Sequence, residues 1–238
     1  MSISAVRKSN VEIVNEVLRK LQTTEVTNLG DTKFSTTLVD FLNDVIDECS
    51  DYGDWQEMYR EVDVTASSSV GTYEMSVSAQ VKNIYEVVWG DDVAPLEVRD
   101  ITDLRRLQRL ASFGTPRQFA VVGVSGVNPL FRVYPIPTQA TINAETSSGG
   151  VFNIAYYKKP GLITAVTADT SSVPAFPSRM LVQGVYAKAL LEENGGEPTR
   201  EYQVALLDYQ RMRKEAQNRF TADTGIDIQF VPTGSRGG

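Results

Sequence analysis

The amino-acid sequence predicts an α+β fold, in which an α-helical bundle built from both ends of the chain carries an inserted antiparallel β domain. Near both ends of the 238-residue chain, apolar residues recur at the spacing of amphipathic helices. Between them, β-branched and aromatic residues are separated by clusters of Gly, Pro and Ser, a pattern typical of short strands joined by turns. Two helices at each end cannot bury their apolar faces alone, so we expect all four to pack together.

The start of the chain contains signals for two helices. Ser9 and Glu12 form the S-x-x-E pattern of a capping box, and an apolar stripe follows at helical spacing. A polar link leads to a second helix, which Ser35 or Thr36 can cap and which runs to about Gly53. The first helical segment of the bundle is therefore expected within residues 1–54.

The single cysteine, Cys49, lies on the apolar face of the second predicted helix. A catalytic thiol needs a histidine partner, and the sequence contains no histidine. We therefore interpret Cys49 as a small buried core residue.

The middle of the chain, residues 55–173, is predicted to form the β domain, as a sandwich or a barrel. A short helix from Thr102 to about Phe113 interrupts the strands, and Gly114 is a suitable stop for it. We expect Trp55 and Trp89 to anchor the core or the junction between the two domains. The predicted strands are residues 58–65, 72–78, 84–89, 118–124, 130–136 and 151–157.

Helical spacing returns after Pro174. Pro177 suits the first position of a helix that Gly195 and Gly196 end, and Pro198 suits the opening turn of a last long helix. We expect residues 174–222 to complete the helical domain with residues 1–54. Residues 223–238 are expected to form an extended C-terminal tail.

Most catalytic chemistry is missing from the sequence. The lack of histidine removes most nucleophilic triads and nearly all zinc sites, and no phosphate loop, dinucleotide fingerprint or calcium loop is present. Two acidic pairs beside glycines, Asp51 with Asp54 and Asp91 with Asp92, are the remaining catalytic resource. Aspartate next to glycine is typical of turns, so we expect no enzyme, no cofactor and no metal site.

The net charge of -7 argues against tight binding to nucleic-acid phosphates, which requires clustered lysine and arginine. It is compatible with a protein past which DNA must slide, because a surface that repels phosphate does not hold a moving duplex. No apolar run approaches the roughly 20 residues that span a bilayer. The first residues lack the apolar region of a signal peptide, so no membrane association and no secretory export are expected.

The C-terminal tail contains a candidate partner-binding strand. Ile226, Ile228 and Phe230 alternate with polar residues and would form one apolar face. A strand this short is unstable alone and needs a sheet edge, so we expect it to pair with an edge on a partner protein or on the next subunit. A disordered terminus is the alternative interpretation.

A second candidate interface lies on the last long helix. Its basic residues are interspersed with acidic ones, and mixed charges at helical spacing suit a protein surface more than DNA. The residues concerned are Arg211, Arg213, Lys214 and Arg219. A further group, Arg105, Arg106 and Arg109, lies opposite or beside the leucine stripe of the short helix and is interpreted as a solvated or intersubunit face.

Three stretches of the sequence resemble the head-to-tail adaptor proteins of short-tailed bacteriophages, the family often called tail tubular protein A or head completion adaptors. The first is FLNDVIDECSDYGDWQEMYREVDV, a helix running into a strand. The second is GTPRQFAVVG followed by PLFRVYPIPT, which is similar to the strand pair and Y-P-x-P turn of that family. The third runs from VPAFPSRMLV to MRKEAQNR and resembles the closing helix pair. The likeness lies in the order of the elements and covers most of the chain.

The resemblance implies a structural virion protein, assembled in the host cytoplasm, without catalytic residues. It implies a homo-oligomeric ring, usually of twelve copies, which binds the portal protein and a tail nozzle or tail tube protein. DNA would pass through the lumen without specific binding. Two alternatives are another tail or head subunit of a phage and, less favoured, a carbohydrate hydrolase built on the β domain.

Overall fold

The computed structural model describes residues 7–77, 80–90, 92, 94–110, 112–145, 150–163 and 174–224. These residues form six α-helices and seven strands, which confirms the predicted mixed α+β class. The chain divides into two compact units. One, here called the helical unit, consists of Met1–Gln56 and Ile163–Gly238, and the other, the β unit, consists of Glu57–Leu162.

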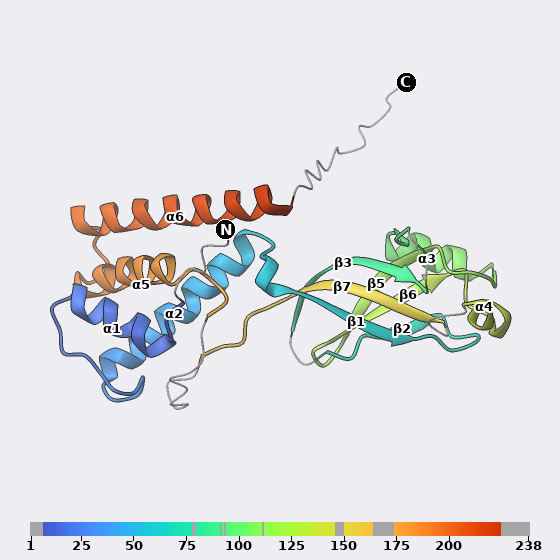
Figure 1. Ribbon diagram of the computed structural model, residues 1–238, viewed down its shortest axis with the longest axis horizontal. Helices are drawn as coiled ribbons and strands as arrows, with labels where there is room; N and C mark the ends of the chain where they lie inside the picture. Colours follow the sequence, from blue (N-terminus) through green and yellow to red (C-terminus); the bar gives the residue numbers. More distant parts are fainter. Residues whose placement is uncertain are drawn as a thin grey trace, which may run out of the picture. The chain divides into compact units, whose positions relative to one another are not determined.

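The helical unit contains α1 (Asn10–Lys20), α2 (Lys33–Tyr52), α5 (Ser178–Glu193) and α6 (Arg200–Thr224). The central helix is α5, which packs against the other three (Figure 1). Its buried residues occupy most of its circumference, as expected of a helix that is surrounded by others. The apolar faces of the segments at both ends of the chain thus meet around α5.

Local hydrogen bonds define where the helices of this unit begin. The capping box predicted at Ser9 is confirmed, since its backbone N–H donates to Glu12 Oε2 at 2.7 Å. The cap predicted for α2 is wrong by three or four residues. Thr32 is the cap, and its hydroxyl accepts from the backbone N–H of Ser35. Ser35 occupies the third helical position, and its hydroxyl accepts from the backbone N–H of Thr32. A capping box needs two side chains three residues apart that bond to each other's backbone N–H, and Thr32 and Ser35 have this spacing.

The two C-terminal helices begin close to the predicted prolines. Pro177 immediately precedes α5 instead of occupying its first position. The last helix begins two residues after Pro198, because the Thr199 hydroxyl accepts from the backbone N–H of Tyr202 at 3.2 Å. A threonine at this position satisfies a free N–H of the first turn, which proline cannot do.

The β unit contains two sheets. A 3₁₀ turn, η1 (Gln56–Met58), leads into the first of them. The first sheet has the strand order β1-β7-β3 and the second the order β2-β6-β5-β4. The strands are β1 (Tyr59–Thr65), β2 (Thr72–Glu74), β3 (Val81–Trp89), β4 (Glu97–Val98), β5 (Gln118–Ser125), β6 (Asn128–Tyr134) and β7 (Val151–Lys158).

The described strand pairs are antiparallel, with one exception that corrects the predicted antiparallel domain. The two-residue strand β4 runs parallel to β5. The alternation of apolar residues does not distinguish the two directions in so short a strand, because both place successive side chains on opposite faces. In β3, bulges between Val81 and Asn83 and between Ile84 and Glu86 interrupt the alternation, and the strand begins earlier than predicted.

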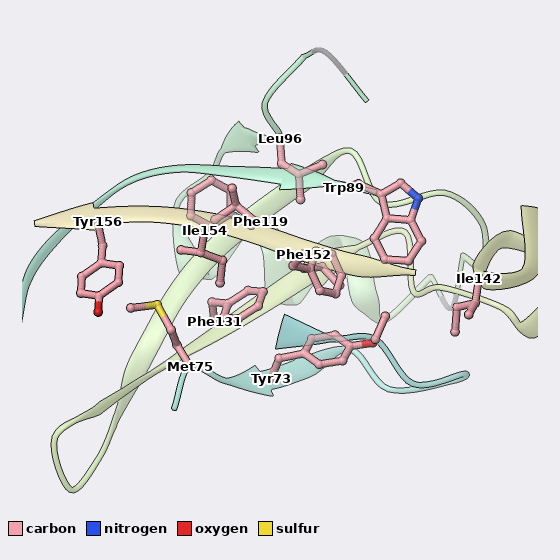
Figure 2. Packing of buried hydrophobic residues seen from close by; sticks show 13 residues of the cluster. Tyr73, Met75, Trp89, Leu96, Phe119, Phe131, Ile142, Phe152, Ile154 and Tyr156 are labelled. Atoms are coloured by element: carbon pink, nitrogen blue, oxygen red, sulfur yellow. The ribbon is translucent and has the colours of Figure 1, made fainter. Parts of the chain in front are cut away.

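Both sheets contribute to one core. In Figure 2, side chains from the two sheets point toward one another around Phe152. The Phe152 ring lies 4.8 Å from that of Trp89, 4.9 Å from that of Tyr73 and 5.5 Å from that of Phe131. The indole N–H of Trp89 donates to Glu145 Oε1 at 2.9 Å, which satisfies the polar atom of this fully buried side chain. The prediction that Trp89 lies in the core is thereby confirmed.

Two short helices complete the β unit. The first, α3 (Ile101–Gln108), ends before the predicted boundary, and the second, α4 (Gln139–Ala144), was not predicted. α3 packs on β5 and β6 through Leu104, which is fully buried. Phe119 of β5 points into the shared core, so Gln118 and Ala120 point to the opposite face. Gln118 lines a pocket together with residues of α3, which places α3 on the outer face of the second sheet.

Candidate interaction surfaces

The interior of the helical unit contains the single cysteine of the chain, Cys49, next to the buried Tyr209. Cys49 is completely buried in α2, and its Sγ lies 3.4 Å from Tyr209 Oη. Burial raises the pKa of the Cys49 thiol to about 11, and the hydrogen bond with Tyr209 lowers it only in part. The thiol is therefore protonated at neutral pH, which agrees with the interpretation of Cys49 as a core residue. Trp55 is also buried, and its indole N–H donates to the carbonyl oxygen of Cys49 at 2.8 Å.

Among the described residues of the helical unit, the most exposed apolar side chains lie on the outer face of α6. Val204 and Leu207 are 55% and 65% exposed, whereas Ala205 and Tyr209 of the same helix are buried. Arg211 and Lys214 continue the exposed face at spacings of four and three residues. These four residues, here called the α6 stripe, are Val204, Leu207, Arg211 and Lys214.

The structure separates the four basic residues proposed for this helix. Arg211 pairs with Asp208 at 3.0 Å and remains exposed, and Lys214 is exposed as well. Arg213 turns inward, with its guanidinium 4.1 Å from the Tyr52 ring centroid. That position gives Arg213 a packing role within the unit. Arg219 belongs to α6, but its side chain lies outside the described residues.

The outer face of the first sheet bears an acidic groove. Glu61 of β1 and Glu86 of β3 are both paired in register with Ala155 of the central strand β7. The two carboxylates therefore lie on either side of one small residue. Asp63 and Asp92 extend the group along a depression of about 280 Å³, whose lining includes neither lysine nor arginine. This set of four carboxylates is here called the acidic groove.

One end of the acidic groove is aromatic. The Tyr59 hydroxyl donates to Glu61 Oε1 at 2.7 Å, and the Tyr59 ring meets that of Tyr157 edge-on at 5.8 Å. Partial burial raises the pKa of the Tyr59 phenol, and the hydrogen bond to Glu61 and the charges of Glu61 and Glu86 raise it further. Tyr59 is thus a hydrogen-bond donor at the edge of a negative surface.

The outer side of α3 carries the opposite charge. Arg105, Arg106 and Arg109 are exposed, and within the described residues none of them forms an ion pair. Arg99, which precedes the helix, pairs with Glu97 at 2.9 Å. These residues, Arg99, Arg105, Arg106 and Arg109, are here called the arginine face.

An open strand edge lies beside the hairpin of β5 and β6. The parallel pairing with β4 covers only Gln118 and Phe119, so the rest of β5 has β6 on one side and no strand among the described residues on the other. Val121, Val124 and Val127 along this hairpin are 49%, 69% and 54% exposed. Gly126, with a φ of +63°, begins its two-residue turn. An exposed apolar edge without charge is a template for pairing with another strand.

The structure describes only some of the other residues that the sequence offers as candidates. Ile226, Ile228 and Phe230 lie outside the described residues, as does Asp91. Asp92 is a turn residue, since its N–H donates to the carbonyl oxygen of Trp89 at 3.0 Å. In the remaining acidic pair, Asp51 belongs to the last turn of α2, and Asp54 follows the C-cap residue Gly53.

Neither a metal site nor a membrane span emerges from the described part of the chain. The acidic residues and the cysteine described there form no group of three or more that could hold a metal ion. No helix within the described ranges is both long and apolar enough to cross a membrane.

Comparison with known proteins identifies the family of this chain. A search of the curated proteins finds no match to this chain. The family model of the SU10 adaptor protein matches residues 11–231, which include all the helices and strands but the first residue of α1. The chain therefore belongs to the SU10 adaptor protein family and is a structural adaptor of a bacteriophage.

Proposed function

We propose that this chain is the head-to-tail adaptor that forms a ring between the portal protein and the tail and lets DNA pass through its lumen. The observation that carries the proposal is the exposed α6 stripe on a member of an adaptor family. Exposed apolar side chains at helical spacing, continued by basic ones, are typical of a helix that docks on another protein. An adaptor needs such surfaces toward the portal, toward a tail nozzle or tail tube protein, and toward its own copies.

The resemblance to short-tailed phage adaptors suggests twelve copies in a virion ring, assembled in the host cytoplasm. The direct test mixes the purified chain with portal rings of the same phage and images the product by electron microscopy. We expect a closed ring on one end of the portal. A chain that leaves the portal bare and binds only tail or head-surface proteins would support the alternative of another virion subunit.

The α6 stripe gives this test a matched pair of variants. Replacing Leu207 by aspartate places a charge in the exposed apolar part of the stripe, and we expect it to reduce portal or neighbour binding at least tenfold. Replacing Thr24, which is exposed in the link between α1 and α2, by aspartate introduces the same charge away from α6; this variant is the control and should bind normally. Equal binding of both variants would remove the stripe from the interface.

We propose that DNA passes the ring without specific binding, a proposal that the net charge of -7 supports. We expect the affinity of the purified protein for duplex DNA at moderate salt to be weaker than micromolar, because few phosphates would be neutralised. The assay is a fluorescence anisotropy titration at two salt concentrations. Submicromolar affinity that falls steeply with salt would contradict the proposal.

We further propose that the C-terminal tail adds a strand to a sheet edge on the portal or on a neighbouring subunit. The alternation of Ile226, Ile228 and Phe230 supports it, and the open edge of β5 is one acceptor of suitable chemistry. Deleting residues 224–238 should reduce assembly on portal rings, because a strand repeated around a ring contributes through avidity.

Point variants of the tail separate strand addition from a mere requirement for chain length. Replacing Ile226 and Ile228 by asparagine removes the apolar face, whereas replacing Asp227 by asparagine changes the opposite face and is the control. We expect only the isoleucine variant to mimic the deletion. Normal assembly of the deleted chain would show that the tail is dispensable.

A further inference from the structure

The acidic groove and the arginine face lie on opposite sides of the β unit. The groove occupies the outer face of the first sheet, because its residues alternate with Val62, Val64 and Ile154, which pack into the shared core. The arginine face lies on α3 and directly before and after it, and α3 covers the outer face of the second sheet. One layer of sheet, the core and a second layer of sheet therefore separate the two charged surfaces.

The chemistry of the acidic groove selects a basic protein surface as its partner. Glu61 and Glu86 stand two strands apart, which places their Cα atoms about 10 Å from each other. Four carboxylates repel a phosphate backbone, which excludes nucleic acid as a favourable occupant. Tyr59, which lines one end of the groove, offers an aromatic ring against which a guanidinium can stack.

The arginine face has the complementary chemistry. Three of its guanidinium groups have no carboxylate partner within the described residues, so they are available for an external one. Arginine forms bidentate bonds with carboxylates and also stacks on tyrosine, so a pair of neighbouring arginines matches both parts of the groove.

We infer that the acidic groove of one copy receives the arginine face of the next copy, forming the contact by which the β units close into a ring. The inference rests on the proposed ring function and assigns it an interface. A ring requires a heterologous contact, in which one surface of a subunit meets a different surface of its neighbour. Two complementary surfaces on opposite sides of one unit satisfy that requirement, whereas a two-fold dimer would bring like charges together.

Charge reversal tests this interface with a built-in rescue. The first variant combines Glu61→Arg with Glu86→Arg, and the second combines Arg105→Glu with Arg106→Glu. Each alone places like charges in every contact of the ring, so we expect about a tenfold or greater loss of closed rings on the portal. An equimolar mixture of the two variants restores opposite charges at every contact of an alternating ring. A chain carrying all four substitutions does the same, so both should regain closed rings.

The readout is the number of adaptor copies on each portal ring, measured by native mass spectrometry and electron microscopy of the full-length chain. Glu192→Arg with Glu197→Arg changes the same charge at exposed positions of the helical unit and is the control. Closed rings formed equally well by both reversed variants would overturn the inference. Failure of the mixture and of the fourfold variant to recover, with thermal unfolding unchanged, would also overturn it.

A milder variant keeps the inference testable if charge reversal prevents folding. Rings held by exposed ion pairs weaken as salt rises, because salt screens their charges. Replacing Glu61 and Glu86 by glutamine should remove most of this salt dependence at the subunit contact. Unchanged salt dependence in that variant overturns the inference, whereas a wild-type chain that forms no ring at all overturns the proposed function and the inference with it.

Discussion

Replacing Gly184 by alanine tests the packing of the helical unit at its closest point. A Cβ atom at Gly184 of α5 would lie 2.8 Å from Val45 Cγ1 of α2 and 3.0 Å from Tyr209 Cε2 of α6. Both neighbours are fully or almost fully buried, so neither can move without disturbing its own contacts. Overpacking of this kind costs about 1–3 kcal/mol. Alanine regains about 1 kcal/mol through its higher helix propensity.

The clash outweighs the propensity gain, so we expect Gly184→Ala to lower the free energy of unfolding by about 1 kcal/mol. Valine, with two more methyl groups facing the same neighbours, should cost more. Urea unfolding followed by circular dichroism measures both changes. Gly161→Ala is the control, because a Cβ there meets no atom within 4 Å and the stability should change by less than about 0.5 kcal/mol. Stability of Gly184→Ala equal to or above that of the wild type would refute the packing argument.

Two further predictions concern buried side chains. With a pKa of about 11, Cys49 is about one part in a thousand thiolate at pH 8, so a thiol reagent should label it only after urea unfolding; rapid labelling of the native protein would contradict its burial. Replacing Trp89 by phenylalanine removes the donor to Glu145 and leaves a cavity, which should lower the free energy of unfolding by about 2–3 kcal/mol. An unchanged urea midpoint would show that this indole contributes little.

The helix starts illustrate how far local sequence information reaches. The capping box at Ser9 follows from residue types three positions apart, which interact within one turn, and the structure confirms it. The cap of α2 was misplaced because Thr32, Ser35 and Thr36 all carry hydroxyls, and only the bonds formed in the folded chain distinguish them. The short elements β4 and α4 gave no periodic signal, since two and six residues are too few to establish one.

The candidate surfaces likewise include residues that local spacing predicts and residues that only tertiary contacts place. Arg211 and Lys214 could be placed on an exposed helical face from their spacing, whereas Arg213 could not be assigned to the interior without knowing that Tyr52 lies beside it. The acidic groove was not predicted at all. Glu61 and Glu86 are far apart in the sequence, and no local pattern indicates that β7 will come between their strands.

The sequence by itself determined the α+β class, the positions of most helices and strands, the burial of Cys49 and the lack of histidine-based chemistry, because each depends on composition or on spacing within a few residues. Tertiary structure alone decided that α5 is the central helix and that β7 joins β1 to β3. It also decided that four carboxylates share one face while the arginines of α3 lie on the other. The physical reason is that spacing specifies which face of an element is apolar, whereas its partner depends on pairing and packing between residues distant in the chain.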